Sequence, residues 1–115
     1  MGYRSDVAIA IRKEEYVKAL LRQDFPTALK EEQYVEVEDV LYWFLEGWKW
    51  YEMFDDVKEI DNFLQKLEEI ETDDNTYVYG FMRMGEADDD FEERGDPYDY
   101  DIHFVRTISV PGHTF

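Results

Sequence analysis

The hydrophobic positions of this chain alternate between the two-residue period of a strand and the three-to-four-residue period of a helix. Residues 3–11 have Val7, Ile9 and Ile11 on one face and the small residues Ala8 and Ala10 on the other. Both faces of the segment are therefore apolar. This pattern predicts a strand in the centre of a sheet, with neighbours on both sides and cover on both faces.

Two segments show a helical period. Within residues 13–22 the apolar side chains form one stripe, and Pro26 ends any continuation; the stripe consists of Tyr16, Val17, Leu20 and Leu21. A longer helix is predicted after residue 55, with Asp55 or Asp56 as its N-cap. Its apolar positions recur every three or four residues and comprise Val57, Ile60, Phe63, Leu64, Leu67 and Ile70.

The remaining apolar segments have the composition of strands. Residues 40–45 and 48–51 are rich in aromatic and aliphatic residues and are separated by Glu46 and Gly47, which predicts a hairpin with its turn at these two residues. The alternative is one long strand with a bulge at Gly47. A further strand is predicted over residues 77–84 after the polar turn 72–75, and a last strand over residues 102–110.

An acidic segment, residues 86–101, lies between these last two strands. Nine of its sixteen residues are Asp or Glu, and Arg94 is its single basic residue. Gly95 and Pro97 interrupt it, so we interpret it as a long loop. Arg83 and Arg106 lie in the flanking apolar strands and are predicted to pair with Glu86 and Asp101.

The order strand, helix, hairpin, helix, strand, strand predicts an α+β fold. We expect a two-layer sandwich in which an antiparallel sheet has two helices on one face, ferredoxin-like with an added C-terminal strand. Residues 1–110 are predicted to form a single α+β domain and residues 111–115 a flexible tail.

Composition excludes several classes of protein. The formal net charge is −17 over 115 residues, yet 44% of the residues are hydrophobic and 17% are aromatic, which favours a folded domain over an acidic disordered tail. Cysteine is absent, so disulfides and thiolate zinc sites are excluded. No apolar run approaches the roughly 20 residues that span a bilayer, and we expect a cytoplasmic protein that does not bind membranes.

The charge limits the candidate partners. A surface this acidic repels nucleic acid, and its carboxylates resemble the phosphates that basic proteins bind. Solubility alone is the competing explanation. Further acidic clusters occur within residues 31–39, 52–61 and 68–74. The residues predicted to contact a basic partner are Asp88, Asp89, Asp90, Glu92, Glu93, Asp96 and Asp99.

Catalytic and metal-binding interpretations have less support. Asp88, Asp90 and Glu92 alternate as in a calcium loop, but Glu93 occupies the position where an EF-hand needs glycine. His103 lies in a predicted strand outside any catalytic motif and is interpreted as a surface residue. We therefore expect no enzymatic activity, no cofactor and no specific metal site.

Three short motifs carry a resemblance over most of the chain. They are the YRSDV sequence that begins at Tyr3, residues 48–51 (WKWY), and residues 83–86 before the Asp cluster. In these motifs the chain resembles small acidic uncharacterised proteins of bacteriophages and prophages. Phage proteins of this size and acidity often neutralise host machinery that handles nucleic acid, including restriction enzymes and CRISPR effectors, so the resemblance implies a host-defence inhibitor such as an anti-CRISPR protein, acting in the bacterial cytoplasm.

The predicted function is inhibition by charge mimicry, in which the chain binds a basic, nucleic-acid-handling host protein and blocks its access to DNA or RNA. The alternative is an oligomerising or scaffold module, with a homodimer as one form, that uses strand edges or packs Trp48 and Trp50 against a partner. A carboxylate metal-binding protein is the third interpretation. The effect of salt on partner binding distinguishes the first two interpretations. Binding by charge mimicry weakens as the salt concentration rises, whereas binding through an apolar interface does not.

Overall fold

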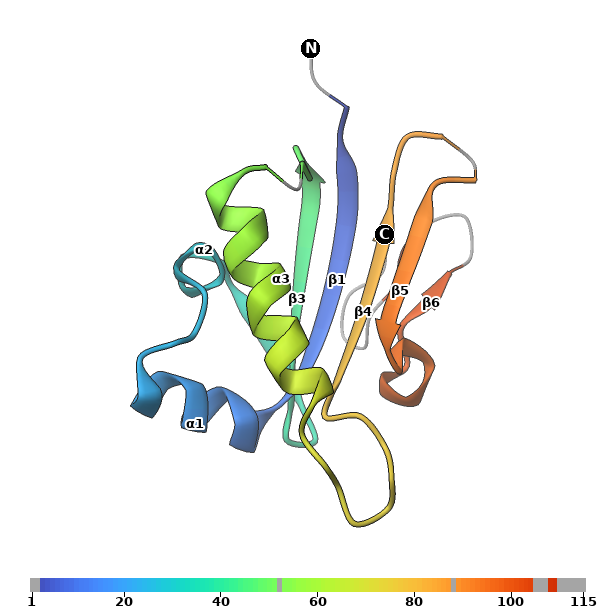
Figure 1. Ribbon diagram of the computed structural model, residues 1–115. Helices are drawn as coiled ribbons and strands as arrows, with labels where there is room; N and C mark the ends of the chain where they lie inside the picture. The colour runs from blue at the N-terminus through green and yellow to red at the C-terminus, as the bar shows by residue number, and fades with distance from the viewer. Residues whose placement is uncertain (1–2, 52, 88, 105–107, 110–115) are drawn as a thin grey trace.

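A computed structural model of the protein describes residues 3–51, 53–87, 89–104 and 108–109. Three helices and seven strands occur in this part of the chain, together with one 3₁₀ helix (Figure 1). In chain order they are β1 (Ser5–Arg12), α1 (Lys13–Arg22), α2 (Thr27–Lys30), β2 (Tyr34–Val37), β3 (Val40–Trp48), α3 (Asp55–Glu68), β4 (Tyr79–Met84), β5 (Phe91–Gly95), η1 (Pro97–Tyr100), β6 (His103–Phe104) and β7 (Ile108–Ser109).

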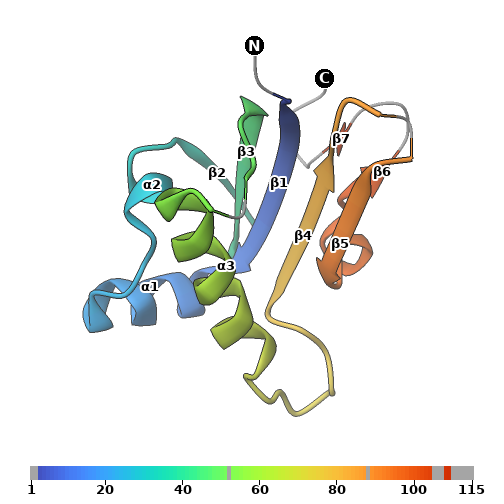
Figure 2. The same ribbon diagram turned by 45° about the horizontal axis from the view of Figure 1, so that its top comes forward.

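Five strands form one antiparallel sheet in the order β2-β3-β1-β4-β5. The four strands β2-β3-β1-β4, with helices after β1 and β3, have the predicted ferredoxin-like arrangement. The helices lie on one side of this sheet (Figure 2). The prediction of a two-layer α+β sandwich is therefore confirmed, although α2 adds a short third helix that the periodicity did not predict.

The predicted central strand is correct, since β1 pairs with β3 on one side and β4 on the other. Val7, Ile9 and Ile11 face the helices and belong to the main core. Ala8 and Ala10 face the opposite side, where Tyr100 and Ile102 of the C-terminal segment cover them. Small side chains at these two positions allow that segment to approach the sheet closely.

The predicted turn at Glu46 and Gly47 is wrong, and the long strand with a bulge is correct. β3 continues through both residues, Gly47 has a φ of +66°, and the register with β1 shifts between Ser5 and Val7. The hairpin turn lies instead at Glu38 and Asp39, whose φ values of 50° and 64° match a type I′ turn. Two acidic residues thus occupy backbone positions that glycine and asparagine usually take.

The acidic segment is not one long loop. Its middle forms β5, which pairs with β4 and is the added strand at the edge of the sheet. The prediction placed that added strand at residues 102–110, but the described parts of this range, β6 and β7, pair with each other in a separate sheet. Hydrophobic period alone could not identify β5, because its sequence FEERG has a single apolar side chain.

Both predicted helices are present, but they differ in which of their side chains are buried. α3 buries the predicted stripe as far as Leu67, and Ile70 lies beyond the end of the helix. The predicted N-cap is wrong, because Phe54 is the N-cap and Asp55 and Asp56 lie in the first turn.

α1 has the predicted bounds, but of its apolar stripe Tyr16 alone packs against the core; Val17, Leu20 and Leu21 are exposed, and the buried positions are Glu15 and Ala19. The tail 111–115 lies outside the described residues, and no described helix is long and apolar enough to cross a membrane.

Candidate functional site

The structure divides the predicted binding residues between the two ends of β5. Asp89 and Asp90 precede the strand, whereas Asp96 and Asp99 follow it. Five residues of strand separate the two groups by roughly 16 Å. Asp88 lies outside the described residues. The predicted residues therefore do not form one continuous contact surface.

At the first end, Arg83 holds two of the predicted residues. Its guanidinium donates to Asp90 Oδ1 at 2.8 Å, to Glu92 Oε1 at 3.1 Å and to the Ser5 hydroxyl at 3.1 Å. The predicted pairing of Arg83 with Glu86 is wrong, because Glu86 accepts the backbone N–H of Arg4 at 3.1 Å. The other predicted pair is not described, since Arg106 lies outside the described residues.

Asp90 consequently has a structural role in the β4–β5 hairpin. The Tyr3 hydroxyl donates to its Oδ2 at 2.6 Å, which ties the N-terminal segment to the hairpin. The hydrogen bond from Arg83 lowers the pKa of Asp90, and the bond from Tyr3 lowers it further. Asp90 and Glu92 thus direct their charge at Arg83, and no three metal-ligating side chains of the described residues are grouped to hold an ion.

The remaining predicted residues differ in their roles. Glu93 accepts a hydrogen bond of 2.7 Å from the Tyr98 hydroxyl. Asp96 caps η1 by accepting the backbone N–H of Asp99. Asp89 and Asp99 have exposed side chains that form no salt bridge with any described residue. Of the described residues in the predicted set, Asp90 and Glu92 are held in salt bridges and Glu93 and Asp96 in hydrogen bonds, so Asp89 and Asp99 are the two carboxylates that a partner can reach most readily.

A denser group of carboxylates lies at the lower end of the molecule in Figure 1, where β1 and α3 end and β3 and β4 begin. Nine exposed acidic residues come from three separate segments around this end, which we call the acidic end. None of the nine forms a salt bridge with a described Lys or Arg. They are Glu38, Asp39, Glu68, Glu69, Glu71, Asp73, Asp74, Asp99 and Asp101.

Arg12, the last residue of β1, connects the segments of the acidic end. Its Nη2 donates to the Thr76 hydroxyl at 3.0 Å, and that hydroxyl donates to Asp74 Oδ1 at 2.8 Å. Its Nε donates at 3.0 Å to the hydroxyl of Tyr100, which in turn donates to the Tyr77 carbonyl. One guanidinium therefore fixes both the loop after α3 and the η1 segment.

Hydrogen bonds and burial also set the ionisation of groups at this end. Hydroxyl donors from Thr76 and Thr72 lower the pKa of Asp74, so this carboxylate stays charged at neutral pH. Burial raises the pKa of Tyr42 to about 12, with Asp101 and Glu38 contributing through their negative charge. The Tyr42 hydroxyl stays protonated and donates to the Tyr100 carbonyl at 2.9 Å.

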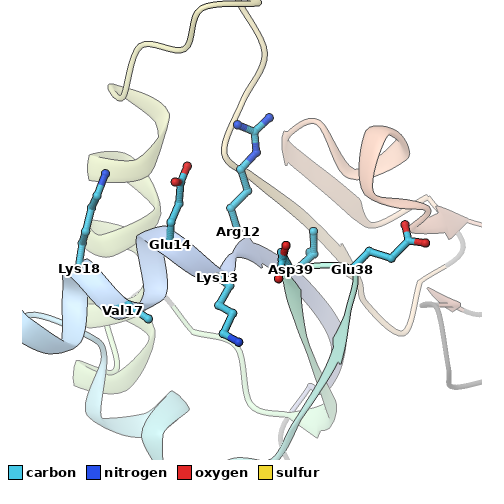
Figure 3. Close-up of a pocket in the computed structure, with 8 residues that line it drawn as sticks. Arg12, Lys13, Glu14, Val17, Lys18, Glu38 and Asp39 are labelled. Carbon is cyan, nitrogen blue, oxygen red and sulfur yellow. The ribbon is translucent and has the colours of Figure 1, made fainter.

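A groove of about 640 Å³ lies beside the acidic end, between the start of α1 and the β2–β3 turn. Arg12 and Lys13 leave this junction in opposite directions (Figure 3). Arg12 is bound to Tyr100 and Thr76, and Lys13 pairs with Glu36 at 3.1 Å. The cationic groups of the groove are thus engaged within the chain, which leaves the neighbouring carboxylates to dominate the local potential.

Trp48 and Trp50 do not form an exposed platform. Both are half-buried and pack against the main core, with ring centroids 6.4 Å apart, and the ring centroids of Trp50 and Phe81 are 5.8 Å apart.

The other predicted acidic clusters lie at different ends of the molecule. Glu38, Asp39 and residues 68–74 lie at the acidic end, whereas Asp55 lies at the other end and Glu52 is not described. The role of Arg12 was missed, although its position two residues after Ala10 places it on the face that the C-terminal segment covers.

Comparisons with known proteins add no family to this description. No protein-family model matches the sequence, and no curated protein and no solved structure matches it. The resemblance to phage proteins therefore stays a prediction. Function is argued below from the charge and geometry of the site itself, since a fold alone does not identify a function.

Proposed function

We propose that this protein is an inhibitor that binds the basic, nucleic-acid-binding surface of a host protein and excludes DNA or RNA by competition. The acidic end is the contact surface, in place of the continuous run at residues 88–99. The observation that carries the proposal is the concentration of nine exposed carboxylates at one end of the fold, none in a salt bridge with a described basic residue.

The charge density supports this assignment. Duplex DNA presents one phosphate per roughly 1.7 Å of axis, so nine phosphates occupy about 15 Å. The whole molecule measures 40 × 29 × 24 Å, so its end face is wide enough for a contact of that length. A basic groove built for phosphates would therefore meet a similar number of negative charges, which accelerates encounter and excludes acidic partners.

Fixed side chains at the acidic end support specific docking. Arg12 holds the loop after α3 and the η1 segment in one arrangement. Because this end is already ordered, binding costs less conformational entropy. Tyr77 and Tyr98 border this end, and the two residues are 42% and 50% exposed. Partly exposed tyrosines are typical anchor residues in protein interfaces, where they fix the register that charge alone does not.

The source of the chain and its host are part of the same proposal. The motifs that resemble phage proteins favour a phage-encoded protein acting in the bacterial cytoplasm on a CRISPR effector, a restriction enzyme or a related enzyme. In such a setting the inhibitor only has to occupy the nucleic-acid site. Catalysis and a cofactor are not required.

The experiment uses two variants with equal charge and different positions. In the first, Glu69, Glu71 and Asp73 at the acidic end are replaced by Lys. In the second, the exposed residues Glu46, Asp55 and Asp89 near the opposite end are replaced by Lys. Each tagged chain is used to capture proteins from a bacterial lysate, and captured nucleic-acid-binding proteins are tested for displacement of labelled duplex DNA or RNA.

We expect the wild type and the second variant to displace the nucleic acid and the first variant to fail. Displacement should weaken as salt rises, because exposed charges are screened. An equal loss of displacement in the two variants would show that total charge matters and the acidic end does not. Full displacement by both variants would show that the acidic end is not the contact surface. Captured proteins that bind no nucleic acid would overturn the proposal.

A further inference from the structure

Glu15 is a buried charged residue that the proposed contact surface does not use. It lies in α1 and is 4% exposed. Its Oε1 pairs with the Nζ of Lys18 at 3.4 Å, and this is the one hydrogen bond that its carboxylate accepts from the described residues. A buried carboxylate ordinarily accepts several hydrogen bonds, because both of its oxygens have lost water. Glu15 therefore has unused capacity to bind a donor.

A cavity of about 270 Å³ opens beside Glu15. Arg12 and the first turns of α1 line one side, and the loop after α3 together with Val78 lines the other. The side chains of Arg12, Glu14 and Lys18 extend towards α3 and this loop, whereas Lys13 points the opposite way (Figure 3). Pockets for drug-sized ligands measure about 300–1,000 Å³, so this cavity suits a group of side-chain size.

The charges that line the cavity favour a cation. Arg12 is already bound to Tyr100 and Thr76. The side chain of Lys18 is 59% exposed, and an exposed ion pair of this length is held weakly. Against these two cations stand four carboxylates, those of Glu14, Glu15, Glu71 and Asp73.

The rest of the lining suits a cation on an alkyl stem. Ile70 and Val78 add apolar surface, and both belong to or pack against the main core. A lysine side chain lays its methylenes along apolar surface and keeps its ammonium beside polar atoms. Lys18 shows that an ammonium group can reach Glu15. A metal ion fits less well, because no three metal-ligating side chains of the described residues are grouped to hold one.

We propose that this cavity receives a lysine side chain of the basic partner protein, and that its ammonium replaces Lys18 beside Glu15. The inference rests on the function proposed above, since Glu71 and Asp73 belong to the acidic end. The exposed carboxylates attract the partner over a distance and are screened by salt. A cation held in the cavity fixes the register of the contact, which exposed charges alone do not.

Nuclear magnetic resonance of the full chain tests the cavity without a partner. The probe is Nα-acetyl-lysine methylamide, which carries an ammonium on the same stem as a lysine in a protein. Its Nε-acetyl derivative has the same stem and no charge. We expect the first compound to shift the amide resonances of residues 12–18 and 70–78 saturably and the second to leave them unchanged. Shifts that do not saturate would mean general accumulation of cations and overturn the proposal.

Two lysine variants change the competing ammonium. Lys18→Met should tighten binding of the probe severalfold, because it frees Glu15, and a purely structural role for Lys18 would not produce a gain. Lys66→Met is the matched control, since its side chain is 60% exposed, also pairs with a carboxylate, and lies outside the cavity. It should leave the affinity unchanged. Equal effects of the two variants would overturn the proposal.

Two glutamate variants change the acceptor. Glu15→Gln should weaken binding of the probe about tenfold, because a hydrogen bond between charged groups is lost. Glu69→Gln removes the same charge from the acidic end outside the cavity and should weaken it by less than about twofold. Circular dichroism establishes that each variant is folded. Equal losses in the two variants would overturn the proposal.

The displacement assay described above assigns the source of the ammonium. Glu15→Gln should weaken displacement of nucleic acid more than Glu69→Gln does. Saturable probe binding combined with equal displacement by these variants would assign the cavity to a free alkylamine and overturn the role of a partner lysine. Failure of the inhibitory function is distinct, because the wild-type chain would then bind the probe and displace no nucleic acid.

Discussion

The Nε of Arg12 donates to the hydroxyl of Tyr100 at 3.0 Å and joins the end of β1 to η1 across 88 positions of the chain. Tyr100 is buried, and its hydroxyl also donates to the Tyr77 carbonyl. The pair connects the centre of the sheet to the segment that covers its second face. The shape of the acidic end therefore depends on a contact inside the fold.

Removal of the Tyr100 hydroxyl should destabilise the protein. Tyr100→Phe leaves the Nε of Arg12 without its acceptor and the Tyr77 carbonyl without the Tyr100 donor, at a cost of about 1–2 kcal/mol in the free energy of unfolding. Tyr98→Phe is the matched control: it removes an exposed hydroxyl that donates to Glu93 and should change stability by less than about 0.5 kcal/mol. Urea denaturation measures both. Equal losses would contradict the structural role of the Arg12–Tyr100 contact.

The fold was largely predictable where one face of an element is apolar and the other is not. α3 has this property, and β1 is apolar on both faces with large side chains on one and alanine on the other; both were placed correctly. β5 was missed because glutamate and arginine fill a strand that is stabilised by pairing with β4. The β2–β3 turn was misplaced because its two acidic residues lack the usual turn composition, and Glu46-Gly47 resembles that composition more closely.

The site was less predictable than the fold. Acidity correctly identifies exposed segments, but it does not distinguish Asp90, which binds Arg83, from Asp89, which projects into solvent. That difference depends on which residue of the hairpin faces the helix side of the sheet. The joining of residues 69–74 and 96–101 at one end depends on long-range contacts through Arg12, which local sequence does not reveal.

The neighbours Asp89 and Asp90 should respond differently to the same substitution. Asp90→Asn removes the negative charge that binds Arg83 and should lower the free energy of unfolding at neutral pH by about 1–2 kcal/mol. Asp89→Asn should change it by less than about 0.5 kcal/mol, because the side chain is exposed and forms no described salt bridge. Chemical denaturation of both variants at pH 7 makes the comparison. Similar stabilities would remove Asp90 from the hairpin network.

The contribution of Asp90 should depend on pH with a defined sign. Its pKa in the folded state is lowered from the ordinary value of 3.8, chiefly by the hydrogen bond from Arg83. The stabilisation is complete above pH 3.8 and is lost as pH falls through the lowered pKa. The difference in stability between the wild type and Asp90→Asn should therefore narrow in acid. A difference that grows below pH 3.8 would have the opposite sign to this linkage.

Two glycines should tolerate alanine to different extents. A Cβ at Gly80 would lie 2.7 Å from the Pro97 Cα, so Gly80→Ala must push η1 away from the sheet at a cost of about 2–3 kcal/mol. At Gly47 the nearest atom would be 4.0 Å away, and the positive φ alone makes Gly47→Ala cost about 1 kcal/mol. Thermal unfolding ranks the two variants. A milder effect at Gly80 would mean that η1 does not pack closely on β4.

Added salt should stabilise the folded protein. The chain has 29 acidic and 12 basic residues, so repulsion between unpaired carboxylates exceeds the attraction within ion pairs, and both are screened. Urea denaturation, which adds no ions, should give a free energy of unfolding that increases with sodium chloride. Replacement of Glu69, Glu71 and Asp73 by Lys changes the formal charge from −17 to −11, by two units at each of three positions, and should reduce the slope. A stability that falls as salt rises would show that ion pairs such as Arg83–Asp90 outweigh the repulsion at the acidic end.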